Sequence, residues 1–147
     1  MSKFNSIAFL VLLSSVALLG IAQQPAPVVK NVPIQPTPAG SGEQMFASYC
    51  AVCHGADGRG NGPVAQSMKT PPANLTVLSQ KNGGVFPANH VTSVLRFGIE
   101  NPAHGAAEMP IWGNLFETLH SSSGDEAMQA RLRITNLTNY LKAIQQK

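Results

Sequence analysis

Hydrophobic residues recur at helical spacing near the start of the region from residue 41 to residue 147. Met45, Phe46 and Tyr49 follow Ser41 and Gln44, two residues that form a capping box at the start of a helix. A first helix is therefore predicted to run as far as residue 50.

A second apolar pattern, with a period near 3.6 residues, predicts a long last helix. Ser123 and Glu126 repeat the capping box before it. A shorter helix is predicted near Asn89–Phe97 and a weak one near Asn74–Gln80. The apolar stripe of the last helix consists of Met128, Ile134, Leu137, Tyr140, Leu141 and Ile144.

The segments between these helices are rich in glycine and proline, and no strand-like alternation stands out. They cover residues 55–63, 70–72, 81–87 and 99–113. Connections of this length are unusual in a small domain unless a bound group organises them. The sequence thus predicts an all-α domain over residues 41–147, whose long loops are expected to be organised by a bound group.

Before this domain lie two segments of different character. Lys3 and the uncharged run of residues 7–22 have the form of a secretory signal, with cleavage expected before Gln23. The alternative is an uncleaved membrane anchor, although 16 residues fall short of the roughly 20 that span a bilayer. Residues 23–40 contain five prolines and predict a semi-rigid linker.

Composition adds little to this picture but excludes one class of function. The chain of 147 residues is 44% hydrophobic and 12% charged, with a formal net charge of +3. Its basic residues are scattered, with no run and no interleaved aromatic residues. No nucleic acid is therefore expected among its partners.

Both cysteines of the chain lie in one short motif, Cys50-Ala51-Val52-Cys53-His54. On a helix, residues three and four positions apart lie on one face. Both thiols and the imidazole can therefore reach one flat ligand. This pattern indicates a covalently attached haem, with thioether bonds from the cysteines and His54 on the iron.

Three other functions of the motif are less consistent with the sequence. A thioredoxin-like redox pair needs a preceding strand, whereas a helix is predicted here. A structural zinc site needs further nitrogen or sulfur ligands, and His90, His104 and His120 form no tight pair. A disulfide within the motif would close a small, strained ring.

With these residues in view, the region 41–147 resembles class I c-type cytochromes, in particular small bacterial periplasmic monohaem ones. The resemblance is carried by Gly42, Phe46, the motif with Gly55, residues 57–63, residues 103–105, residues 108–113 and Tyr140. It implies a cytochrome c-like fold in which the first and last helices cross near Gly42 and Phe46 and pack on Tyr140, with long loops around one haem c.

The sixth ligand of the iron decides between electron transfer and open-site chemistry. Met109, in a loop bounded by glycine and proline and followed by Pro110, is the expected ligand, with His104 as its rival. Met45 and Met128 are expected in the core. Met68 lies too close to the motif, and His90 and His120 are expected in solvent.

Three further residues are candidates for contacts around the haem. In the family, a proline carbonyl after the motif accepts the other N–H of the histidine, and Pro63 matches it. Trp112 either donates to a propionate or packs in the core. Arg59 either offsets propionate charge or is a solvated loop residue.

The resemblance implies a monomeric, periplasmic carrier of single electrons between redox proteins, not an enzyme. Two alternatives stay open. The first is a subunit of a dehydrogenase or oxidase complex, anchored to the membrane by an uncleaved N-terminal segment. The second is a haem peroxidase or gas-binding protein, if Met109 does not stay bound to the iron.

Overall fold

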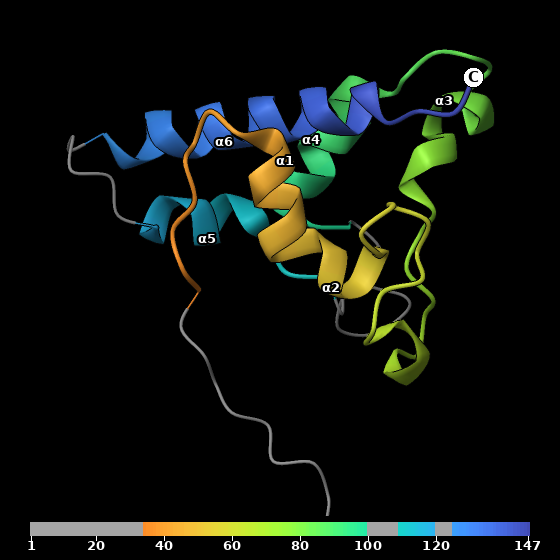
Figure 1. Cartoon of the computed structure of the whole chain (residues 1–147). Helices are drawn as coiled ribbons and strands as arrows, with labels where there is room; N and C mark the ends of the chain where they lie inside the picture. Colours follow the sequence, from red (N-terminus) through yellow and green to blue (C-terminus); the bar gives the residue numbers. More distant parts are fainter. Residues whose placement is uncertain (1–33, 100–108, 120–124) are drawn as a thin grey trace, which may run out of the picture. The chain divides into compact units, whose positions relative to one another are not determined.

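The computed structural model describes residues 34–99, 109–119 and 125–147, and these residues form helices and loops without a strand (Figure 1). The all-α fold predicted from the sequence is confirmed. The longer helices are α4 (Ala88–Phe97), α5 (Trp112–Thr118) and α6 (Glu126–Ala143). The short elements are α1 (Gly42–Met45), η1 (Phe46–Cys50), α2 (Ala51–His54), η2 (Ala65–Ser67), η3 (Leu75–Val77) and α3 (Leu78–Lys81).

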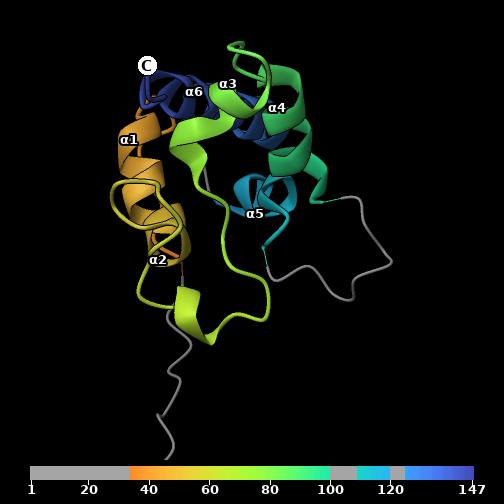
Figure 2. The same cartoon turned by 90° about the vertical axis from the view of Figure 1, so that its right-hand side faces the viewer.

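Helix α6 is the element against which α1, α4 and α5 pack (Figures 1 and 2). Its buried apolar residues are Ala130, Ile134, Leu137 and Leu141, which share one helical face. Met128 was predicted on this face but is 61% exposed. It precedes Ala130 by two residues, about 200° of rotation, so its side chain leaves the helix on the far side.

The start of α6 also differs from the prediction. Asp125, not Ser123, is the N-cap residue, and its carboxylate accepts a hydrogen bond of 2.9 Å from the amide of Met128. The helix is therefore capped by a single side chain, two residues later than the pair Ser123 and Glu126 implied. At the start of α1 the predicted cap is present, because Ser41 Oγ accepts from the amide of Gln44 at 3.2 Å.

The crossing of α1 and α6 occurs at Gly42, as predicted. A Cβ atom on Gly42 would lie 2.7 Å from Cβ of Tyr140 and closer still to the carbonyl oxygen of Asn136. One turn later, Phe46 packs on Tyr140 with 5.3 Å between ring centroids. The absence of a side chain at Gly42 therefore sets how closely the two helices approach.

The residues just before α1, which belong to the semi-rigid linker predicted over residues 23–40, contact the helices. The hydroxyl of Tyr49 donates to the carbonyl of Gln35 at 2.8 Å and accepts from the amide and hydroxyl of Thr37, each at 3.0 Å. Buried Arg133 donates to the same Thr37 hydroxyl at 3.3 Å, and Asn136 donates to the carbonyl of Ala39. Side chains of the domain thus bind backbone groups of a segment whose two prolines have no amide hydrogen.

Aromatic side chains fill the space between α1, η1 and α5. Tyr49 stacks on Trp112 with 5.7 Å between ring centroids, and Phe116 lies within 5.9 Å of both rings. Met45 and Phe116 are fully buried, which confirms Met45 as a core residue. The helix predicted near residues 89–97 is present as α4, and the weak one near 74–80 is split between η3 and α3.

Replacement of Gly42 by alanine should destabilise the protein although alanine favours helices. The new methyl group would overlap Asn136 and Tyr140, so α1 must move off α6. We expect a loss of about 1–3 kcal/mol in the free energy of unfolding, measured by guanidinium denaturation. Gly40→Ala is the matched control, because no atom lies within 4 Å of its Cβ position, and it should stay within about 0.5 kcal/mol of the parent.

Replacement of Tyr49 by phenylalanine should release the segment before α1. The hydroxyl group is lost while the aromatic packing is kept, and the cost should be about 1–2 kcal/mol of unfolding free energy. Tyr140→Phe serves as the control, since the Tyr140 hydroxyl has no hydrogen bond to a described residue. Equal stability of the two variants would show that the hydrogen bonds of the Tyr49 hydroxyl to residues 35 and 37 contribute nothing.

Candidate functional site

The motif Cys50–His54 lies where the first helix changes its winding. In η1 the amide of Ala51 donates to the carbonyl of Phe46, five residues earlier, which makes a π-helical turn. The regular helix α2 then carries Cys53 and His54. The sequence predicted a helix up to residue 50 but not this wider turn. Tyr49 and Cys50, the last two residues of this turn, are both buried.

The imidazole of His54 is held by a backbone carbonyl. Its Nδ1 lies 2.9 Å from the carbonyl oxygen of Ala73. A carbonyl oxygen only accepts, so Nδ1 carries the proton and, in the neutral ring, Nε2 keeps its lone pair. No described residue hydrogen-bonds Nε2. The ring is thus fixed in one tautomer, with the nitrogen that could bind a metal left open.

This contact corrects the assignment of Pro63. The sequence predicted that the carbonyl of Pro63 accepts from the histidine, whereas the structure gives this role to Ala73, ten residues further on, and leaves Pro63 exposed. The backbone near Pro63 is engaged elsewhere, because the loop after the motif folds back onto α2.

That loop supplies donors to the end of α2. The last carbonyls of a helix have no partner within the helix. Here the amide of Gly60 donates to the carbonyl of His54 at 2.7 Å, that of Gly62 to Cys53 at 3.0 Å, and that of Val64 to Val52 at 3.2 Å. The helical turn that carries the motif is therefore braced by backbone hydrogen bonds on its C-terminal side.

The environment of Cys50 favours an uncharged sulfur. Burial, and to a lesser extent the nearby Cys53, raises the pKa of the Cys50 thiol to about 12. A zinc-bound cysteine must be a thiolate, whereas a thioether carries no charge. In addition, the described residues contain no group of three or more His, Cys, Asp or Glu side chains that could hold a metal ion. The chemistry of the motif fits thioether attachment better than a structural metal site.

Comparison with known proteins agrees with this geometry. Residues 39–110 match the family model of cytochrome c, a range that contains the motif, Ala73 and Met109. No curated protein and no solved structure matches the chain. The chain carries a cytochrome c domain. Domains of this family bind haem c covalently and generally transfer electrons to and from redox partners.

The donor set of this cytochrome c domain fits such a haem. Two sulfurs three residues apart and an oriented imidazole lie within five residues, at the end of η1 and in α2. The neutral surroundings of Cys50 and the open Nε2 of His54 are what thioether bonding and iron ligation require. Cys50, Cys53 and His54 are therefore the residues that would hold the group.

Met109 and Trp112 lie on one short stretch of the cytochrome c domain. Met109 is partly buried and packs against the core, while Trp112 is 6% exposed and begins α5. The stacking of Trp112 on Tyr49 fits the packing role that the sequence left open. Residues 100–108, including the rival ligand His104, lie outside the described residues, as does His120. His90 is exposed, as predicted.

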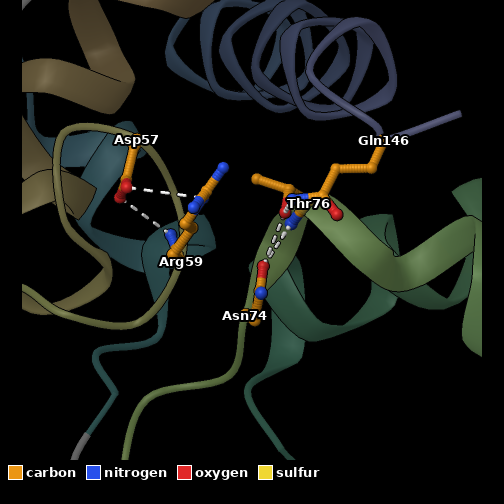
Figure 3. Close-up of polar contacts among 5 residues, drawn as sticks. All are labelled: Asp57, Arg59, Asn74, Thr76 and Gln146. Atoms are coloured by element: carbon orange, nitrogen blue, oxygen red, sulfur yellow. Dashed lines mark hydrogen bonds and ion pairs between the residues drawn. The ribbon is translucent and has the colours of Figure 1, made fainter.

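Arg59 is a solvated loop residue in this structure. Its guanidinium forms an ion pair of 3.5 Å with Asp57, and its side chain is 61% exposed (Figure 3). Asp57 also accepts from the backbone amide of Arg59 at 3.1 Å. This local pairing is the second of the two roles that the sequence allowed for Arg59.

Sequence reasoning missed Ala73 because it contributes only a backbone atom. Its neighbours held the signal: Pro71 and Pro72 keep the chain extended, and Asn74 suits a cap position. The expected secretory signal, with an uncleaved anchor as the alternative, was assigned to residues 7–22. Within residues 34–99, 109–119 and 125–147, no helix is long and apolar enough to cross a bilayer, and residues 7–22 lie outside these ranges.

Replacement of Gly62 by alanine should disturb the motif directly. A Cβ there would lie 2.6 Å from the carbonyl carbon of Cys53, so the loop and α2 must separate. We expect a loss of about 1–3 kcal/mol in unfolding free energy and a lower yield of haem-loaded protein, measured by denaturation and absorbance. Gly40→Ala again serves as the control, and parent-like behaviour of Gly62→Ala would contradict the bracing role of the loop.

Proposed function

We propose that this chain is an exported monohaem cytochrome c that carries single electrons, with haem c joined to Cys50 and Cys53 and with His54 and Met109 as axial ligands. The observation that carries the proposal is the hydrogen bond from Nδ1 of His54 to Ala73. It leaves Nε2 open beside two cysteines in a cytochrome c domain.

A haem bound at this site supplies the exchange of one electron between ferrous and ferric iron. The chain contributes a rigid surrounding for that exchange. His54 keeps its ring orientation through Ala73, and α2 is braced by the loop of residues 60–64. A site that does not rearrange with oxidation state suits a relay more than an enzyme.

Met109 is the proposed second ligand on chemical grounds. A thioether is a soft ligand that favours the reduced ion, so His/Met ligation raises the potential. Its partly buried position against the core supports a fixed rather than a solvated side chain. With this ligand in place, no position on the iron is left for peroxide or dissolved gases.

We further propose a periplasmic location and redox proteins as partners. The N-terminal pattern of Lys3 and residues 7–22 supports export, with cleavage before Gln23. Removal of Lys3 leaves a formal charge of +2, which two haem propionates would bring near zero. Docking should therefore depend only modestly on salt.

The proposal is tested by absorption spectra of oxidised and reduced protein, with and without carbon monoxide, and by the mass of the mature chain. We expect covalent haem, a weak red-region band from ferric methionine ligation, and little carbon monoxide binding. Met109→Ala should keep the haem but lose that band, bind carbon monoxide and lower the potential.

Met128→Ala is the matched control, because that methionine is 61% exposed and should leave the spectrum unchanged. A Met109→Ala protein with the parent spectrum would overturn the sixth ligand. Ready carbon monoxide binding by the parent would favour a gas-binding protein or peroxidase, and a chain without haem would end the proposal altogether.

A further inference from the structure

Two glutamines that follow α6 bind the segment next to Ala73. The side-chain nitrogen of Gln145 donates to the carbonyls of Leu75 and Leu141, each at 2.7 Å. Its side-chain oxygen accepts from the amide of Ser79 at 2.9 Å. One side chain thus joins the end of α6 to both η3 and α3.

Gln146 binds the same segment through Thr76. Its backbone amide donates to the Thr76 carbonyl at 2.7 Å, and its side-chain nitrogen donates to the Thr76 hydroxyl at 2.9 Å. Figure 3 shows Gln146 reaching Thr76, with Asn74 on the other side of Thr76. We call Gln145 and Gln146 the glutamine latch.

The segment that the latch holds determines the direction of the Ala73 carbonyl. This carbonyl belongs to the peptide unit shared with Asn74. The side-chain oxygen of Asn74 accepts from the amide and hydroxyl of Thr76, at 2.9 and 2.8 Å, and the amide of Leu75 donates to Gly58 at 2.7 Å. Every hydrogen bond that fixes Asn74 therefore also orients the Ala73 carbonyl, which accepts from His54.

The two residues before Ala73 are prolines. Pro71 and Pro72 come directly before it and have no amide hydrogens with which to fasten the chain. On the C-terminal side of the acceptor, Gln146, Thr76 and Asn74 form one connected set of hydrogen bonds, and Gln145 binds Leu75 and Ser79 beside it.

We propose that Gln145 and Gln146 are positioning residues that aim the Ala73 carbonyl at Nδ1 of His54 and so set the basicity of the imidazole. The inference rests on the proposed function, in which Nε2 of His54 ligates the haem iron. A strong hydrogen bond at Nδ1 makes the ring a more basic ligand. Ferric iron gains most from a basic ligand, so loosening the latch raises the reduction potential.

The test uses the haem-loaded protein and the variants Gln145→Met and Gln146→Met, which keep side-chain length and remove the amide. The reduction potential is measured by spectroelectrochemical titration. Exchange of the Nδ1 proton of His54 is followed by NMR in the ferrous state. We expect a higher potential and proton exchange that is faster by roughly three- to tenfold, the factor given by loss of one net hydrogen bond.

Gln80→Met is the matched control, because Gln80 is exposed and has no hydrogen bond to a described residue. A second pair of variants changes Thr76, the residue that Gln146 binds. Thr76→Val removes the hydroxyl that joins Asn74 and Gln146, and Thr76→Ser restores it. The valine variant should shift the potential upward and the serine variant should return it to the parent value.

Lower stability with unchanged potential and exchange in the glutamine variants would overturn the inference and leave the latch a structural contact. If those variants do not fold, the comparison of Thr76→Val with Thr76→Ser decides. A parent protein without haem would instead refute the proposed function. A haem-loaded parent whose potential is the same in all variants would refute the latch alone.

Discussion

The hydrogen bond between Nδ1 of His54 and the carbonyl of Ala73 is the constraint on which the site depends. An imidazole on a short helix can rotate about two side-chain bonds, and either nitrogen can carry the proton. One backbone acceptor removes both freedoms at once. It requires that a loop some twenty residues away in sequence be held against α2, and much of the remaining structure can be understood as meeting that requirement.

Two sets of contacts with the long helix hold the Ala73 loop against α2. Gly42 lets α1 lie close on α6, so the position of η1 and α2 is set by a contact that tolerates no side chain. In addition, Gln145, just after α6, forms hydrogen bonds with η3 and α3. The same long helix therefore fixes both partners of the His54–Ala73 bond. A domain without strands among its described residues has no ladder to align its loops, and hydrogen bonds from Gln145 and Gln146, just after α6, serve that purpose instead.

Local signals explain what could be predicted from the sequence. The cysteine–histidine motif, the cap at Ser41, the close approach at Gly42 and the stripe through Ile134 and Leu137 each depend on residues near in sequence or on side-chain type. The structure has the cap, the close approach and the stripe at these positions, and it places the motif on helical turns. The family match to residues 39–110 supports the same reading of the motif.

Predictions that depended on backbone atoms or on rotational phase were less successful. Pro63 was chosen from its place after the motif, but the acceptor is a carbonyl whose position depends on distant hydrogen bonds. Met128 seemed to extend the apolar stripe, yet its rotation about α6 places it in solvent. Residues 34–40 belong to the stretch of 23–40 assigned to a linker from its prolines, and composition does not reveal that Tyr49 and Arg133 offer them hydrogen-bond partners. What a sequence shows poorly is which side chains will satisfy which backbone groups. In this domain that information determines how the imidazole is oriented, and so it bears on function as much as on fold.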